Sequence, residues 1–309
     1  MQHVRRGASL SILLVLGAAR LGAECGTVFS IPDSFVLFGN YNELRLIAAD
    51  RVRVLHPPVN EGYNGGYFAV PSLAARDGTI AWGYAIAWQE EHHSARFALG
   101  LLRRDQQWKT YGDFDDIGDA GISPDGSKVA VVVMQQGRLK LLIFDVASER
   151  FIEGPYPRGM WTRGTPSWSP DLTRLAVQLH LPDQKSIVAA LDVRSGEIRP
   201  LGEGFNPQWS PDGQWIAFYS GRDCQLVHPD GTGFRTALHL NDTWTAARSF
   251  SWGGPVWSPG GGQLLLNVMK NDGPSLDVLL LDLTTGRTTT KGKNVLPVFG
   301  WIRRPAREP

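Results

Sequence analysis

One short pattern recurs along this chain, and the repeat constrains the fold more than any other feature. The pattern is clearest at positions 206–220, which read NPQWSPDGQWIAFYS. Similar stretches lie at 164–179, 254–268 and 120–133, and weaker copies surround Asp77 and Asp33. The turn positions 33, 77, 125, 171, 212 and 260 are 41 to 48 residues apart. A period of this length indicates a repeat protein.

Each copy carries two turns with a chemical rationale. The first, as in Ser210-Pro211-Asp212-Gly213, suits a type I turn, because Pro presets φ, Asp bonds the local backbone and Gly takes the left-handed position. Such a turn between short runs of strand-forming residues predicts a tight hairpin. The second turn begins with an aspartate 18 to 22 residues later, at Asp145, Asp192, Asp230 and Asp282.

A unit of this size with four short strands is the blade of a β-propeller. In the third copy we expect strands at 120–123, 128–134, 139–145 and 151–153. Pro166, Pro207 and Pro255 each open an innermost strand, where a missing amide donor costs little. We expect the Trp two residues after each Pro to wedge between neighbouring blades. The sequence therefore predicts an all-β, six-bladed propeller of four-stranded antiparallel blades.

The ring is expected to close through both ends of the chain. Seven segments can serve as innermost strands, at Phe29, Leu73, Ile122, the three Trp positions and residues 296–301, but only six sets of outer strands exist. We expect residues 296–301 to pair with the strands of 34–55, which removes two open edges. The segment at Phe29 is then displaced or pairs elsewhere.

The P-x-W-S-P-D-G-x-x-[IL]-A-[FV] repeat resembles that of the TolB-type six-bladed propellers, distant relatives of the WD-repeat proteins. The resemblance covers nearly the whole chain after its first residues, and it implies the fold but no function. TolB itself carries an α/β domain before its propeller, for which we expect no room here. A role in the Tol envelope system therefore does not follow.

Residues 1–23 resemble a secretory signal peptide. Arg5 and Arg6 precede an apolar run over 10–19, and Leu-Gly-Ala precedes Glu24. The alternative of a membrane anchor needs roughly 20 apolar residues. The arginine pair leaves twin-arginine export open, with general secretion preferred. We thus expect a propeller over 24–302 without a transmembrane segment, a polar tail over 303–309, and a periplasmic or extracellular location as a monomer.

The cysteine count bears on a possible disulfide, and the net charge bears on the class of partner. Cys25 and Cys224 are the only cysteines, and an exported chain can pair them if their Cα atoms lie within about 7 Å. The formal net charge is +1, and the first 23 residues hold three arginines and no acid, which leaves −2 for the remainder. Nucleic acid is not an expected partner, because no basic patch is present.

Motifs for catalysis are absent, so we expect no enzyme activity and no cofactor. The chain has no G-x-S-x-G, P-loop, H-E-x-x-H or paired C-x-x-C. Two polar clusters remain. Asp113, Asp115, Asp116 and Asp119 are candidate ligands for a hard cation such as Ca²⁺, with a solvated acidic loop as the alternative reading. Residues 90–93, Glu-Glu-His-His, have adjacent side chains that point apart in regular backbone, so a shared metal needs an irregular one.

The loops that lead into the innermost strands are rich in Tyr, Trp and Arg, the residues enriched at binding hot spots. They share one face of the propeller with the connections between second and third strands. The residues we expect to bind a partner there are Tyr63, Tyr67, Arg158, Trp161, Arg163, Arg222, Trp244 and Arg248. The alternative is that these aromatic side chains only pack beneath their own loops.

Three functional classes are compatible with these features. The first, which we favour, is an exported scaffold that binds a protein, peptide or glycan of the cell envelope. The second is a metal-dependent hydrolase at the channel mouth, similar to propeller lactonases, with the 113–119 carboxylates as ligands. The third is a structural assembly module. The fold alone does not choose among them.

Overall fold

The computed structural model describes the chain from Phe29 to Arg303 with several gaps. The described ranges are 29–39, 44–48, 51–55, 71–74, 78–89, 94–103, 107–155, 161–181, 183, 185–241, 243–246, 253–271 and 276–303. Residues 1–28 and 304–309, which hold the predicted signal peptide and most of the predicted polar tail, lie outside them. None of the described segments forms a helix of the length and apolarity that a membrane crossing requires.

The strands form six antiparallel sheets, one per repeat, which we call blades one to six. Blade one is β25 (Val298–Arg303), β1 (Ser34–Gly39), β2 (Leu44–Ala48) and β3 (Arg51–Leu55). Blade two is β4 (Ser72–Leu73), β5 (Ile80–Gln89), β6 (Ser94–Leu102) and β7 (Trp108–Phe114). Blade three is β8 (Asp116–Ile122), β9 (Lys128–Gln135), β10 (Arg138–Asp145) and β11 (Arg150–Glu153).

The remaining blades follow the same order from the centre outward. Blade four is β12 (Trp161–Trp168), β13 (Arg174–His180), β14 (Ser186–Asp192) and β15 (Ile198–Glu203). Blade five is β16 (Phe205–Trp209), β17 (Ile216–Ser220), β18 (Asp223–Val227) and β19 (Arg235–His239). Blade six is β20 (Trp244–Ala246) and β21 (Val256–Trp257), both paired with β22 (Gln263–Lys270), then β23 (Leu276–Asp282) and β24 (Thr288–Gly292).

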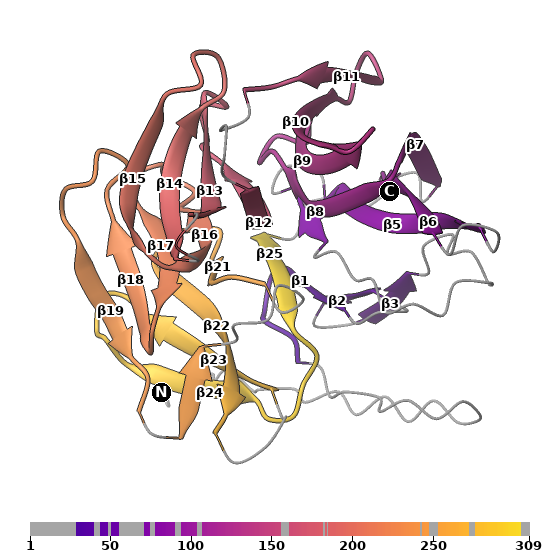
Figure 1. The fold of residues 1–309 in the computed structure, drawn as a ribbon. Helices are drawn as coiled ribbons and strands as arrows, with labels where there is room; N and C mark the ends of the chain where they lie inside the picture. The colour runs from indigo at the N-terminus through magenta and orange to yellow at the C-terminus, as the bar shows by residue number, and fades with distance from the viewer. Residues whose placement is uncertain are drawn as a thin grey trace, which may run out of the picture.

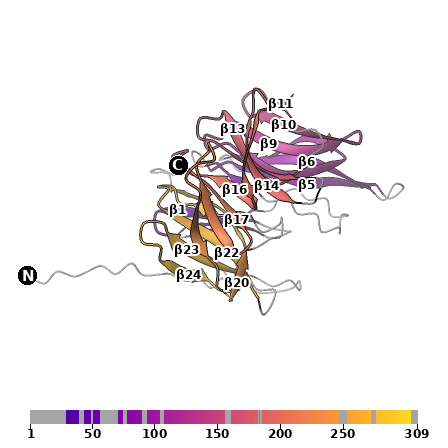
Figure 2. The ribbon, with the colours of Figure 1, turned by 60° about the vertical axis from the view of Figure 1, so that its left-hand side comes forward.

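The six sheets stand in a ring, which confirms the predicted propeller (Figure 1). In Figure 2 the sheet of β22, β23 and β24 lies at the opposite end of the molecule from that of β9, β10 and β11. This placement fits blades three and six of a six-membered ring.

The predicted strands of blade three are confirmed, with one correction at its innermost strand. β8 begins at Asp116 rather than at 120, and its pairing with β9 shifts register between Ile117 and Ala120. A bulge therefore joins two short paired stretches into one strand. Asp116 and Asp119 are strand residues as a result, and the acidic stretch is not a loop.

The ring closes as the sequence predicted. β25 pairs antiparallel with β1, with Val36 opposite Trp301, and the Trp301 indole Nε1 donates to Ser34 Oγ at 2.9 Å. The segment at Phe29 is displaced from the sheet. Its ring is buried and meets Phe38 edge-on at 5.0 Å between ring centroids. Phe29 thus packs against the closing blade instead of belonging to a strand of it.

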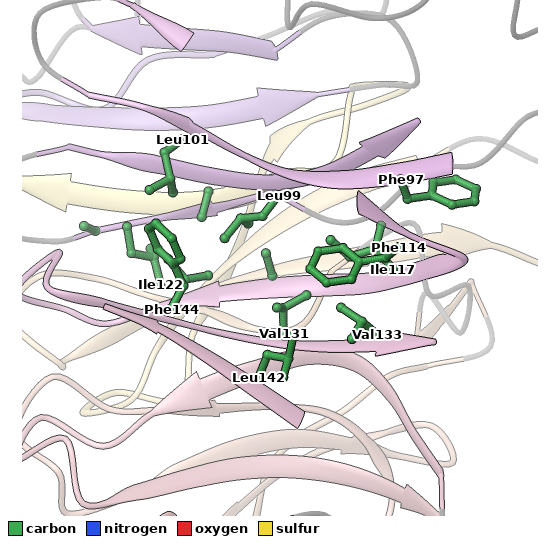
Figure 3. Packing of buried hydrophobic residues seen from close by; sticks show 14 residues of the cluster. Phe97, Leu99, Leu101, Phe114, Ile117, Ile122, Val131, Val133, Leu142 and Phe144 are labelled. Carbon is green, nitrogen blue, oxygen red and sulfur yellow. The ribbon is translucent and has the colours of Figure 1, made fainter. Parts of the chain in front are cut away.

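Apolar side chains fill the spaces between neighbouring blades. Figure 3 shows the cluster between blades two and three, where Leu99 and Leu101 of β6 face Val131 of β9 and Phe144 of β10. These strands are buried on both faces because each sheet is covered by two others, which explains their unbroken apolar runs.

The tryptophans of the repeat lie between blades, as predicted. Trp168 packs with apolar residues of blades three and four, and its indole Nε1 donates to the backbone oxygen of Gly121 at 2.9 Å. Trp257 of blade six donates in the same way to Gln208 of blade five at 3.0 Å. Trp209 is buried between blades four and five, but its Nε1 has no hydrogen-bond partner. The Trp of the P-x-W motif therefore packs between neighbouring blades, and Trp168 and Trp257 also form a hydrogen bond to the preceding blade.

The aspartates of both turn series act as local hydrogen-bond acceptors. Asp171 Oδ1 accepts from the hydroxyls of Ser169 and Thr173, at 2.6 and 2.8 Å. In the second series, Asp192 Oδ1 accepts the backbone N–H and the hydroxyl of Ser195, at 2.7 and 2.9 Å. These bonds explain why a Ser or Thr lies two or three residues after most of these aspartates.

The same bonds make stability depend on acid. Backbone and hydroxyl donors, from Ser148, Ser195 and Thr285 respectively, lower the pKa of Asp145, Asp192 and Asp282. A pKa that is lower in the folded state gives stability above the unfolded pKa, about 3.9, which is lost as the pH falls through the folded pKa. We therefore expect the melting temperature to fall progressively below about pH 5.

A pH series of thermal melts tests this expectation. Asp282→Asn keeps an acceptor oxygen in the turn but does not titrate, so it should flatten the acid-dependent fall. Glu153→Gln, which changes an exposed carboxylate outside the turns, is the control. A melting temperature that is constant from pH 6 to pH 3 would contradict the linkage.

Cys224 is a free, completely buried thiol on β18. Burial raises its pKa to about 12, with a smaller contribution from the charge of Asp223. Cys25 lies outside the described residues. The sulfur of Cys224 thus behaves as a core atom of blade five rather than as a reactive group.

Candidate binding site on the loop face

The topology gathers two kinds of connection on one face of the ring. On this loop face, the second strand of each blade joins the third, and the outermost strand joins the innermost strand of the next blade. The opposite turn face carries the Ser-Pro-Asp-Gly turns. A cavity of about 330 Å³ opens on the loop face between blades four and five. Its lining consists of Gln178, His180, Ser186, Glu203, Gly204, Phe205, Ser220 and Gly221.

A chain of hydrogen bonds fixes the polar wall of this cavity. The backbone N–H of Asn206 donates to Gln178 Oε1 at 3.2 Å, so the amide nitrogen of Gln178 must face the other way. That nitrogen lies 3.1 Å from His180 Nε2 and 3.4 Å from Ser186 Oγ. The Ser186 hydroxyl lies 3.1 Å from His180 Nδ1. Gln178 is buried, so this orientation is held inside the protein.

The hydrogen-bond partners determine which atoms of Gln178, His180 and Ser186 carry the hydrogens in this network. Because Gln178 donates to His180 Nε2, a neutral His180 carries its hydrogen on Nδ1. Nδ1 then donates to Ser186 Oγ, which also accepts from Gln178. A serine hydroxyl has two acceptor positions and one hydrogen. Both acceptor positions are therefore used, and the hydroxyl hydrogen of Ser186 is left to donate to a further group.

A second part of the wall combines a charge pair of blade four, an aromatic ring and a close approach of two backbone segments. Glu203 Oε1 lies 3.3 Å from Lys185 Nζ, and both side chains are more than half exposed. The half-buried ring of Phe205 lies 5.7 Å from that of Tyr219. A Cβ at Gly204 would lie 2.5 Å from the backbone oxygen of Tyr219, so only glycine allows this approach. The wall is polar at its rim and aromatic below it.

Several residues predicted to bind a partner lie beside this cavity. In the pairing of β12 with β13, Trp161 stands opposite His180 and Arg163 opposite Gln178. Both belong to the start of β12 rather than to a loop. Arg222 is exposed and directly follows Gly221 in the turn of blade five. Four other predicted residues lie outside the described residues: Tyr63, Tyr67, Arg158 and Arg248.

Trp244, another of the residues predicted to bind a partner, belongs to a strand of blade six and packs within it. It begins β20 and packs on the apolar cluster between blades five and six. Its Nε1 donates at 3.2 Å to Oδ2 of Asp277, a carboxylate with no exposed surface. The other oxygen of Asp277 accepts the backbone N–H of Asn294 at 3.0 Å.

Substituting Trp244 is therefore expected to affect stability. Trp244→Ala removes packing and takes the indole donor away from Oδ2 of the buried Asp277 carboxylate, which should cost about 2 kcal/mol of the free energy of unfolding. Trp244→Phe keeps most of the packing and should cost about half as much. Urea denaturation measures both. Unchanged stability in Trp244→Ala would show that the side chain is not needed for the fold and would favour its predicted role in partner binding.

The four candidate metal-binding aspartates have other partners. Arg96 forms ion pairs with Asp113, at 2.7 Å, and with Asp115. Asp115 also accepts the backbone N–H of Gln136 at 2.7 Å, and Asp116 accepts that of Ile117 at 2.9 Å. Asp119 accepts from Thr165 Oγ1 of blade four at 3.4 Å. Over the described ranges, no three His, Cys, Asp or Glu side chains gather so that they could hold a metal ion. The Glu-Glu-His-His stretch falls in the gap at 90–93.

Sequence reasoning missed the residues that line the cavity. Gln178, His180 and Ser186 flank the connection between the second and third strands of blade four, whereas the residues predicted from the sequence are mostly Tyr, Trp and Arg of the loops that enter the innermost strands. One signal was present: Gln178 interrupts the apolar run Leu-Ala-Val-Gln-Leu, and a polar residue inside a buried strand has to be hydrogen-bonded.

Solved structures of other proteins share the propeller fold of this chain. No family profile matches the chain. A TolB homologue of Chlorobium luteolum is 31% identical over 129 residues, which are 40% of this chain and 27% of that protein. The structure of TolB from Acinetobacter baumannii has a TM-score of 0.64 at 13% identity and covers 87% of this chain and 66% of that one. The chain thus spans about a quarter of the Chlorobium protein and about two-thirds of the Acinetobacter TolB chain.

The resemblance to TolB-type propellers is confirmed at the level of the fold. A puromycin-hydrolyzing peptidase of Mycobacterium tuberculosis is also similar, with a TM-score of 0.55 at 15% identity, over 90% of this chain and 45% of that one. A similar propeller fold thus occurs both in a TolB protein and in a peptidase, so the fold alone does not indicate whether a chain is catalytic. The class defined here is a TolB-like six-bladed β-propeller with a polar cavity on its loop face.

Proposed function

We propose that this chain is an exported, non-catalytic propeller that binds a protein, peptide or glycan of the cell envelope on its loop face. The observation that carries the proposal is the cavity between blades four and five. It lies on the face where binding residues were expected, and Trp161, Arg163 and Arg222 lie at its edge by strand register or chain position. Most small-ligand sites are concave and combine apolar surface with a few placed polar groups.

The geometry of Ser186 and His180 supports a binding role over hydrolysis. A nucleophilic serine needs a base whose unprotonated nitrogen faces its hydroxyl. Here Gln178 occupies Nε2, so the nitrogen that faces Ser186 carries the proton. The 113–119 carboxylates are hydrogen-bonded or ion-paired to Arg96, Thr165 and backbone N–H groups. A metal ion would have to replace these partners, which disfavours the alternative of a metal-dependent hydrolase.

Export is the second part of the proposal. The basic, apolar and small-residue pattern of residues 1–23 supports secretion to the periplasm or beyond. Mass spectrometry of the secreted protein should find an N-terminus at or near Glu24. A product that is retained in the cytoplasm and begins at Met1 would argue against export.

The binding face can be tested by blocking one face at a time. In a Cys25→Ser background, the only native thiol is the buried Cys224, so an added surface cysteine can be labelled selectively. Arg222→Cys places a polyethylene glycol maleimide on the loop face, and Glu197→Cys places it on the turn face of blade four. Partners captured from envelope extract should be lost with the first label and kept with the second. Equal capture by both labelled forms would overturn the assignment of the face.

A further inference from the structure

The cavity between blades four and five also indicates the chemistry of its ligand. Resting on the binding function proposed above, we infer that it takes a neutral, hydroxyl-rich ligand, namely a saccharide unit of a glycan. The inference depends on three properties of the lining: its hydrogen-bonding groups, its balance of charge, and the aromatic side chain beside them.

The hydrogen-bonding groups suit hydroxyls, which donate and accept at once. The hydrogen-bond chain through Gln178 and His180 leaves Ser186 as a donor toward a further acceptor. Glu203 supplies a carboxylate that only accepts, and Ser220 supplies a hydroxyl that can do either. A ligand with both donors and acceptors satisfies these groups, whereas an apolar ligand would leave them unpaired.

The charge balance disfavours an ionic ligand. Glu203 is paired with Lys185 at 3.3 Å, and both are more than half exposed, so the pair itself is worth little. An anionic ligand that displaced Lys185 would meet the carboxylate, and a cationic ligand bound to Glu203 would meet the ammonium. Farther along the same face, the carboxylate of Asp223 is paired with His239 Nδ1 at 2.6 Å. A neutral ligand can use Glu203 and Lys185 without breaking their pair.

The aromatic component is Phe205. Its ring is half-buried, packs against the apolar cluster of blades five and six, and lines the cavity. The face of an aromatic ring carries partial negative charge. The C–H groups on one face of a pyranose can lie on such a surface while its hydroxyls reach Ser186, Ser220 and Glu203.

An extended peptide fits this cavity less well. Strand addition needs an open edge with free backbone groups. β13, β14 and β17 are each paired on both sides. β15 and β16 end their sheets, and the backbone N–H of Asn206 on β16 is already taken by Gln178. Recognition here therefore relies on side-chain hydroxyl and carboxylate groups.

Saturation-transfer NMR and calorimetry with defined probes test the inference. The neutral probes are glucose, galactose, mannose and N-acetylglucosamine with their β-linked disaccharides. The charged probes are glucosamine and galacturonate, and the peptide probe is acetyl-tetraalanine amide. We expect binding of at least one neutral sugar. Binding only of a charged sugar, only of the peptide, or of none of the probes would overturn the inference.

Variants locate the binding. Ser186→Ala and Glu203→Gln should each weaken binding of the neutral sugar about fivefold or more, the change expected for one lost hydrogen bond. Ser220→Ala is a second test that leaves the hydrogen-bond chain of Gln178 intact. The matched control is Glu197→Gln, an exposed carboxylate of the same blade that is also ion-paired, with Arg199 at 3.7 Å, but lies on the turn face.

Glu203→Gln and Ser220→Ala should keep the melting temperature of the parent chain, which separates loss of binding from loss of fold. Unchanged affinity in Ser186→Ala, Glu203→Gln and Ser220→Ala would overturn the assignment of the cavity. Failure of every sugar, combined with loss of partner capture when position 222 is blocked, would sink the saccharide inference and leave the proposed binding face standing.

Discussion

A chain that ends at Val295 is expected to be insoluble or to lack the cooperative unfolding of the full chain. The truncation removes β25, so β1 would present an open edge. The packing supplied by the buried side chains of Val298, Trp301 and Ile302 would be lost. Truncating one large aromatic in a core costs about 3–5 kcal/mol. Since a whole domain is stable by roughly 5–15 kcal/mol, losing the strand exceeds what the fold can absorb.

The loss also reaches blade six, because Asn267 binds the closing strand through its side chain. Its Nδ2 donates to the backbone oxygen of Val298, and its Oδ1 accepts the N–H of the same residue, both at 2.9 Å. Asn267 has no exposed surface, so removing β25 takes two hydrogen bonds away from a buried amide. Closure thus joins blades one and six as well as the two ends of the chain.

Circular dichroism and thermal melting compare the truncated chain with two references. A chain ending at Arg303 keeps all of β25 and should melt like the full chain. Asn267→Leu keeps the strand but loses both side-chain bonds to Val298, and its stability should lie between the two. A truncated chain that melts within a degree or two of the full one would show that the ring does not depend on this strand.

The blades could be predicted from the sequence because their turns are local. Pro211, Asp212 and Gly213 define a turn by backbone preferences and bonds over two or three residues, and six such turns fix the period and the blade count. The start of β8 was placed too late because the bulge between Ile117 and Ala120 depends on its partner β9. No local pattern marks such a bulge.

The site was harder to predict because it is assembled from distant parts of the chain. Gln178, Phe205 and Ser220 meet only when blades four and five pack together, and none belongs to a recognised motif. The aromatic loops lead to the same face as the cavity, since Trp161 and Arg163 stand opposite His180 and Gln178 in the strand pairing. The structural contact of Trp244 could not be predicted, because its partner, Asp277, is 33 residues away and completely buried.

Gly121→Ala is expected to be the most damaging single substitution at the seam between blades three and four. Gly121 lies on β8, where a Cβ would stand 1.8 Å from the backbone oxygen of Pro166. The oxygen belongs to the innermost strand of the next blade and cannot rotate away as a side chain would. The two strands must therefore separate, which also strains the bond from Trp168 Nε1 to Gly121 O.

Overpacking of this kind costs typically 1–3 kcal/mol, and a rigid backbone neighbour places Gly121→Ala at about 3 kcal/mol or more. At about 2–4 °C per kcal/mol for a chain somewhat smaller than this one, the melting temperature should fall by roughly 6–12 °C. Gly262→Ala is the matched control, because a Cβ there meets no atom within 4 Å and its φ is not left-handed. It should melt within about 2 °C of the parent chain. If Gly121→Ala and Gly262→Ala melt alike, β8 and β12 do not approach as closely as the P-x-W motif requires, and the packing of blade three on blade four is looser than described.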